Sequence, residues 1–172
     1  SFGAAYFNIG RIHEALGQLD KAEDYYRQAS SKGKRFADGL ANVGRLKLMQ
    51  GKADDARRLF QDALNIDKYN GEAQLNLAQD ARLRRDFVTS VKHIRDALKG
   101  NAKNAKAYAV LARVYYDMGL FELAKLVCIT GLKIDESFAD LNNTLGLIHL
   151  KLDDVRAALA AFRAAVAANP RY

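Results

Sequence analysis

The chain has 172 residues, of which 49% are hydrophobic and 27% are charged, and this balance excludes an intrinsically disordered chain. Its single cysteine excludes an internal disulfide framework, and no stretch approaches the roughly 20 apolar residues of a membrane span. The net charge of +7 favours acidic partners without naming one. The chain starts at Ser1 with no signal-like segment, so we expect a piece of a longer protein.

The same residue pattern recurs every 34 positions, which predicts five copies of one structural unit. The copies span residues 3–36, 37–70, 71–104, 105–138 and 139–172, within a single predicted domain over 1–172. A column of large apolar residues holds Tyr26, Phe60, Ile94, Cys128 and Phe162. A column of small residues holds Gly10, Gly44, Ala78, Ala112 and Gly146. Three further columns, which start at Ile9, Ala22 and Ala29, keep the same step, so we exclude chance as the origin of the pattern.

Each copy is predicted to form two helices joined by a tight turn. In the fourth copy, apolar residues recur at i, i+3, i+4 and i+7 over residues 108–115, which indicates one buried helix face. Gly119 follows, and glycine readily takes the left-handed conformation that ends a helix. The same turn falls, in chain order, at Gly17, Gly51, Arg85 and Asp153 in the other copies. One such hairpin cannot bury its apolar faces alone, so neighbouring hairpins are expected to stack.

The period and these columns resemble the tetratricopeptide repeat (TPR) family over residues 3–172. The resemblance implies an all-α fold, a right-handed TPR superhelix (α-solenoid) of five helix-turn-helix repeats that serves as a protein–protein interaction scaffold. The chain departs from the family pattern at the proline position, which only Pro170 fills; the other copies have Lys34, Lys68, Ala102 and Glu136 there.

In proteins of this family, repeat positions 2, 6, 9 and 13 line a concave groove where extended peptides bind. Position 6 holds Asn8, Asn42 and Asn76 in three successive copies. An asparagine amide has donor and acceptor groups, so a ladder of amides can hold a peptide backbone whatever its side chains. The alternative interpretation is that these asparagines are tolerated polar surface residues.

Cationic residues flank the amide ladder and predict an acidic peptide. Position 9 carries Arg11, Arg45 and Arg113, whose planar guanidinium groups suit carboxylates. The full predicted peptide-binding set is Asn8, Arg11, Asn42, Arg45, Asn76, Gln79, Arg82, Lys106, Arg113 and Tyr116. The alternative is that the arginines are solvated, several of them paired with Glu14, Asp38 or Glu72.

Two other functions remain open at this stage. The last helix, over 157–168, carries Leu159, Phe162 and Val166, which we predict to form an edge interface. Self-association through this edge would suit a structural component of an assembly, for example a bacterial envelope or motility complex. A basic solenoid that binds nucleic acid is the third hypothesis, carried by Arg82, Arg84 and Arg85 at one turn. The alternative interpretation of this cluster is a solvated edge, as basic clusters at a turn usually are.

The sequence does not predict enzymatic chemistry. Three histidines and one cysteine are scattered over separate hairpins without metal-ligand spacing, and the glycines follow the 34-residue register and do not form a phosphate loop. Cys128 stands in the large apolar column, so we interpret it as a buried hydrophobe. We therefore expect no cofactor, no metal and no small-molecule substrate.

Overall fold

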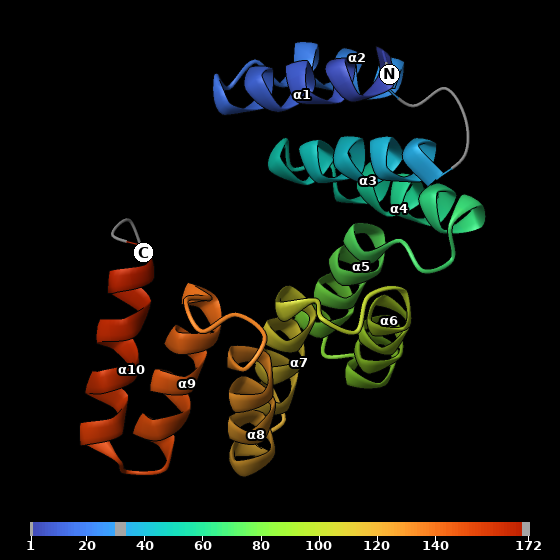
Figure 1. Ribbon diagram of the computed structural model, residues 1–172. Coiled ribbons are helices and arrows are strands. Elements are labelled where there is room, and N and C mark those ends of the chain that lie inside the picture. The colour runs from blue at the N-terminus through green and yellow to red at the C-terminus, as the bar shows by residue number, and fades with distance from the viewer. Residues whose placement is uncertain (1, 30–33, 170–172) are drawn as a thin grey trace. The chain divides into compact units, whose positions relative to one another are not determined.

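The computed structural model describes residues 2–29 and 34–169, and these residues form ten helices and no strands (Figure 1). Pro170 lies outside the described residues. The helices are α1 (Phe2–Ala15), α2 (Leu19–Ala29), α3 (Lys34–Met49), α4 (Ala53–Ile66), α5 (Gly71–Leu83), α6 (Phe87–Gly100), α7 (Ala105–Asp117), α8 (Phe121–Leu132), α9 (Ala139–Lys151) and α10 (Val155–Ala168). They pair as five helical hairpins, one in each predicted copy, so the predicted all-α helix-turn-helix repeat is confirmed.

The turn inside each hairpin has the left-handed backbone expected from the sequence. Gly17, Gly51 and Gly119 have φ values of +72°, +74° and +77°. Arg85 and Asp153 occupy the same position with φ values of +62° and +57°, although this conformation costs a residue with a side chain about 1 kcal/mol or more. The repeat position therefore sets the turn geometry even where the residue is not glycine.

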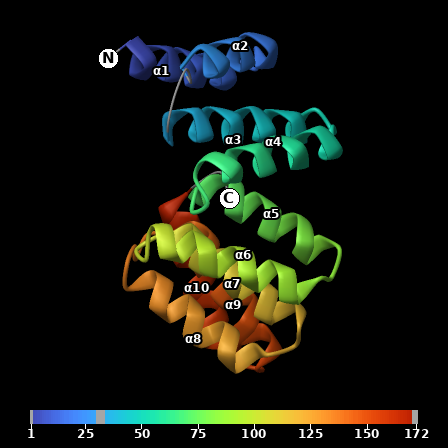
Figure 2. The same cartoon turned by 90° about the vertical axis from the view of Figure 1, so that its right-hand side faces the viewer.

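The chain divides into two compact units, residues 1–77 and 78–172, each with its own core. In the first unit the hairpin of α1 and α2 packs beside that of α3 and α4 (Figure 1), and Tyr26 and Phe60 are buried between helices. In the second unit, which Figure 2 shows from the side of α6 and α8, residues of α7, α8 and α9 form a core around Cys128 and Leu141. Tyr26, Phe60, Ile94 and Cys128 of the large column are thus core residues, whereas Phe162 is half-buried.

The small and large columns contact each other within a hairpin. A Cβ added to Gly10 would lie 2.8 Å from the Tyr26 ring, and one added to Gly44 would lie 2.7 Å from the Phe60 ring. In the fifth copy the corresponding distance, from Gly146 to Phe162, is 2.6 Å. The third and fourth copies combine alanine with a smaller partner, as Ala78 with Ile94 and Ala112 with Cys128. Glycine occurs where its partner in the large column is aromatic, because the ring leaves no room for a Cβ.

No helix in the described part of the chain is long and apolar enough to cross a membrane.

Candidate functional site

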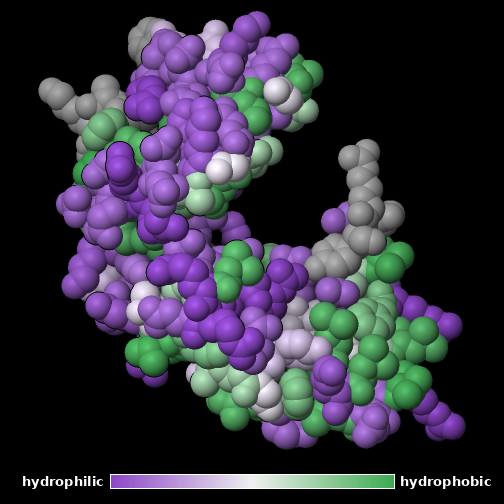
Figure 3. Space-filling view, turned by 180° about the vertical axis from the view of Figure 1, so that it is seen from behind, coloured by the Kyte–Doolittle hydropathy of each residue, from purple (hydrophilic) through white to green (hydrophobic). Residues whose placement is uncertain are grey.

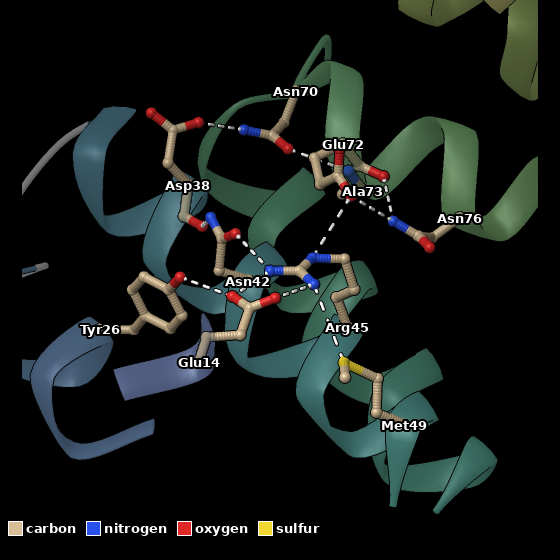
Figure 4. Close-up of polar contacts among 10 residues, drawn as sticks. All are labelled: Glu14, Tyr26, Asp38, Asn42, Arg45, Met49, Asn70, Glu72, Ala73 and Asn76. Atoms are coloured by element: carbon tan, nitrogen blue, oxygen red, sulfur yellow. Dashed lines mark hydrogen bonds and ion pairs between the residues drawn. The ribbon is translucent and has the colours of Figure 1, made fainter. Parts of the chain in front are cut away.

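The three asparagines of the predicted ladder all lie in the first unit, on α1, α3 and α5. Asn8 is exposed, whereas Asn42 and Asn76 are half-buried. Asn42 Nδ2 donates to the backbone oxygen of Asp38 at 2.7 Å, and Asn76 Nδ2 donates to that of Glu72 at 2.8 Å (Figure 4). The amides of Asn42 and Asn76 are therefore held in defined orientations by the preceding turns of their own helices.

Beside Asn42, the side chains of Glu14, Tyr26 and Arg45, from three different helices, form a hydrogen-bonded cluster (Figure 4). The carboxylate of Glu14 is at its centre. Arg45 donates to it through Nη1 at 2.5 Å and Nη2 at 2.6 Å, and the Tyr26 hydroxyl donates at 2.8 Å. A bidentate guanidinium–carboxylate hydrogen bond is among the strongest polar contacts in proteins, because both partners are charged. The cluster ties α1 and α2 to α3.

The hydrogen bonds of the cluster shift the pKa values of Glu14, Tyr26 and Arg45. The hydrogen bond from Arg45 holds the pKa of Glu14 below its ordinary value of 4.5, against the opposing effect of burial. The bond to Glu14 raises the pKa of Arg45, and burial together with the bond to Glu14 raises the pKa of Tyr26. Glu14 is therefore an anion and Tyr26 a hydrogen-bond donor at neutral pH.

A second set of contacts joins α3 to the start of α5. Asn70 is buried; its Nδ2 donates to Asp38 Oδ1 at 2.7 Å, and its Oδ1 accepts from the backbone nitrogen of Ala73 at 3.0 Å. Asn70 thus caps the first turn of α5 and positions Glu72 on that turn. Glu72 Oε1 lies 3.9 Å from Arg45 Nε, so Arg45 is placed between two carboxylates.

An open pocket of about 540 Å³ borders this cluster, with Arg11, Glu14, Asn42 and Arg45 on its polar side and Phe7, Ala15, Tyr26 and Met49 completing the lining. Arg11 is exposed on the pocket wall. A smaller pocket of about 220 Å³, next to Asn8 and Asp38, shares the ring of Phe7. The structure thus brings four predicted site residues, Asn8, Arg11, Asn42 and Arg45, to two neighbouring hollows.

Arg45 fits the alternative that the sequence left open, because it is paired with Glu14 and near Glu72. Asp38, the other acid named for that role, accepts from Asn70. Sequence reasoning missed Tyr26 and Asn70 as polar partners. The contact of Arg45 with Glu72 does have a sequence signal, because an acid at position 2 of one copy follows an arginine at position 9 of the copy before it.

The other predicted site residues, Gln79, Arg82, Lys106, Arg113 and Tyr116, belong to the second unit. Arg82 is paired with Asp117, and Arg113 lies 3.7 Å from Asp140. The ring of Tyr116 packs edge-on against Phe121 at 5.4 Å. Gln79 and Lys106 are exposed. The two arginines are thus partnered by acids of the next repeat.

The basic cluster proposed for nucleic acid is also engaged by neighbouring groups. Arg84 pairs with Asp80 at 2.9 Å, Arg82 pairs with Asp117, and Arg85 lies over the ring of Phe87 at 5.7 Å. Two of the three arginines are thus paired with carboxylates, whereas the Phe87 ring leaves the charge of Arg85 in place.

The predicted edge residues differ in their exposure. Leu159 and Val166 on α10 are 50% and 55% exposed. The space-filling view shows apolar surface around the C-terminal hairpin (Figure 3). Phe162 is half-buried, because its ring packs against Gly146 of the same hairpin. Leu159 and Val166 therefore form the exposed part of the predicted edge.

Cys128 is fully buried, and burial raises its pKa to about 12, so its thiol stays protonated. His13 stacks on Tyr25 with ring centres 5.1 Å apart. Among the described residues, no group of three or more histidine, cysteine or acidic side chains could hold a metal ion.

Comparison with known proteins identifies the repeat. Family models described as tetratricopeptide repeat match residues 3–31, 105–138 and 143–172, together more than half of the chain. The human protein O-mannosyl-transferase TMTC1 is 24% identical over 111 residues, which is 64% of this chain but only 12% of that protein.

Two solved structures show the same fold. A chain of the APC/C hetero-tetramer Cut9–Hcn1 has a TM-score of 0.81 at 19% identity, over 99% of this chain and 34% of its own length. YrrB, described as a TPR protein with an unusual peptide-binding site, has a TM-score of 0.61 at 17% identity, over 96% of this chain and 85% of its own. The chain therefore spans about an eighth of the human relative and a third of the Cut9–Hcn1 chain that it matches.

Proposed function

Because the chain belongs to the tetratricopeptide repeat family, a family of protein-interaction scaffolds, we propose that its first unit binds an extended peptide along Asn8, Asn42 and Asn76. The observation that carries this proposal is the orientation of the amides, two of which are anchored to the backbone oxygens of their own helices. If neighbouring first helices are roughly 10 Å apart and an extended chain rises about 3.3 Å per residue, each amide meets every third peptide residue. The description of YrrB as having a peptide-binding site supports this use of the fold.

An acidic side chain of the peptide would enter the pocket beside Arg11. Arg45 is already bound to Glu14 and so contributes little free positive charge, whereas Arg11 is exposed. The rings of Phe7 and Tyr26 form part of the apolar lining beside such a contact. The specificity for acid therefore rests on one guanidinium, with Arg45 and Glu14 as its rigid support.

The test uses random 12-residue peptides displayed on phage and selected against the wild-type chain. Selected peptides are then measured by isothermal titration against the triple variant Asn8→Ala, Asn42→Ala, Asn76→Ala. Losing three backbone hydrogen bonds of about 1 kcal/mol each predicts roughly hundredfold weaker binding. Arg11→Gln should weaken acidic peptides about tenfold and leave neutral peptides unchanged.

The matched control is Gln61→Ala, Asn65→Ala, which removes amides from α4, outside the proposed groove, and should not change affinity. Helicity by circular dichroism checks that each variant folds. Selected peptides that bind the triple variant as tightly as the wild type would overturn the groove assignment.

A second candidate function, head-to-tail assembly, is favoured by apolar residues exposed at both ends of the repeat array. Leu159 and Val166 are exposed on α10, and Ile12 is 58% exposed on α1. The residue equivalent to Ile12 in the fifth copy is Ile148, which is fully buried in the core that α9 shares with α8. The α10 face of one copy could therefore pack on the α1 face of the next, as α8 packs on α9.

Such contacts are heterologous, so assembly would not stop at two copies. Velocity sedimentation should show a mean mass that keeps rising with concentration, and the double variant Leu159→Lys, Val166→Lys should abolish the rise. Ala160→Lys, an exposed position on the same helix, is the control. An unchanged rise in the double variant would exclude this edge.

A further inference from the structure

The outward face of α8, in the second unit, carries an apolar patch that repeat packing does not explain. Leu126 is 60% exposed, and Leu123 and Ile129, three residues to either side, are each 41% exposed. Residues three apart lie on neighbouring sides of one helix face, so the three side chains form a continuous surface centred on Leu126. We call Leu123, Leu126 and Ile129 the α8 patch.

The same three repeat positions are mostly charged in the first three copies. In chain order they hold Lys21, Asp24 and Arg27, then Asp55, Arg58 and Gln61, then Thr89, Lys92 and Arg95. Apart from the half-buried Thr89, these side chains are exposed, as expected for the outer side of the second helix of a hairpin. The fold therefore tolerates polar residues here, and the leucines and isoleucine of the fourth copy have another cause.

Charges of opposite sign border the α8 patch at its two ends. Glu122 lies four residues before Leu126. Lys133 lies seven residues after it, directly past the end of α8, and its backbone is still helical, so both fall on the same line along the helix surface. Both are exposed, and Glu122 also contacts Lys125 at 2.6 Å. Between them, the Thr130 hydroxyl donates to the backbone oxygen of Leu126 at 2.9 Å, which turns its polar atom back onto the helix.

We propose that the α8 patch is the contact surface of a closed two-fold dimer, in which α8 packs antiparallel against α8 of a second copy. In this register Leu126 meets its own counterpart, and Leu123 meets Ile129 of the other copy. With a rise of 1.5 Å per residue, Glu122 of one copy is about 5 Å along the axis from Lys133 of the other, within reach of a lysine side chain. Glu122 of each copy thus lies near Lys133 of the other only when the two helices are antiparallel.

A second copy is the occupant that this charge order selects, because an antiparallel copy supplies both ion pairs at once. The contact is one pair of short helices, smaller than standard interfaces of about 1,600 Å², so the dimer is weak, with a dissociation constant on the order of 10 µM. The geometry is isologous and stops at two copies. This separates it from the open-ended assembly through α10 and makes it independent of peptide binding in the first unit.

Sedimentation equilibrium between about 1 and 200 µM tests the dimer, because this range spans the expected dissociation constant. Leu126→Gln should weaken dimerisation by about a hundredfold, since two leucines leave the centre of the contact. Arg58→Gln, the equivalent outer position of the second copy, is the matched control and should change nothing. Leu126 is exposed in the single chain, so the variant is expected to fold normally.

Charge reversal tests the register. Glu122→Lys alone and Lys133→Glu alone should each weaken the dimer roughly tenfold, and the double reversal should restore it, because both ion pairs re-form with exchanged signs. A wild-type chain that stays monomeric, a dimer insensitive to Leu126→Gln, or single reversals that the double does not rescue would each overturn the proposal. Mass growth abolished only by the α10 variants would assign association to that edge instead.

Discussion

Replacing Glu14 by alanine is expected to destabilise the first unit by about 2 kcal/mol. Its carboxylate accepts two hydrogen bonds from Arg45, at 2.5 and 2.6 Å, and one from Tyr26 at 2.8 Å. Hydrogen bonds to charged groups contribute about 1.5–3 kcal/mol each when fully buried. The Glu14 and Arg45 side chains keep 20% and 29% of their exposure, so solvent screening reduces the sum of these bonds to the lower figure.

Because the chain has two compact units, hydrogen exchange of the amides in α1–α3 is a sharper assay than a single melting curve. A loss of 2 kcal/mol lowers protection there about thirtyfold in Glu14→Ala. Arg45→Ala and the double variant complete a cycle whose coupling energy should be about 1–2 kcal/mol. Asp24→Ala, which removes an exposed acid from α2, is the control. A coupling energy below about 0.5 kcal/mol would refute the reasoning, since the pair would then behave as an ordinary surface ion pair.

The same pair predicts how stability depends on pH. The pKa of Glu14 is lower in the folded chain than its ordinary value of 4.5, so its contribution is complete above that value. The contribution is lost as the pH falls through the folded pKa, because the neutral acid binds Arg45 more weakly. Glu14→Gln has no such titration, so the stability difference between wild type and this variant should shrink below pH 4.5. A difference that stays constant into acid would contradict the assigned shift.

Two further predictions concern the core. Gly44→Ala should cost about 1–3 kcal/mol in urea unfolding, because the new Cβ would lie 2.7 Å from the Phe60 ring. Adding Phe60→Ile should recover about 1 kcal/mol of that cost. Gly51→Ala is the control: an added Cβ has no neighbour within 4 Å there and the strain comes from the φ of +74°, so Phe60→Ile should not reduce its cost. Fully additive effects would show that the two columns do not compete for space. Burial raises the pKa of Cys128 to about 12, so the native thiol should resist iodoacetamide at pH 8 and react only in denaturant. Labelling of the native chain at the unfolded rate would contradict its burial.

The repeat architecture could be predicted from the sequence because each hairpin is a local structure. The positions of the turns follow from a 34-residue step, and the left-handed backbone persists at Arg85, where the residue alone would not require it. The large column also predicted core positions, since a large apolar residue such as Tyr26 fills space between its own hairpin and the next, where it packs with Val43 and Leu46.

The use of the polar residues was decided by tertiary structure. The sequence placed Arg45 in a row of cations, but Glu14, 31 residues earlier, determines that its guanidinium is bound within the first unit. Likewise, the apolar composition of α8 is plain in the sequence, whereas the exposure of Leu126 depends on which side the neighbouring helices cover. Backbone periodicity is a short-range property that each segment carries by itself. Side-chain pairing and exposure depend on distances between helices, which exist only once the hairpins have packed.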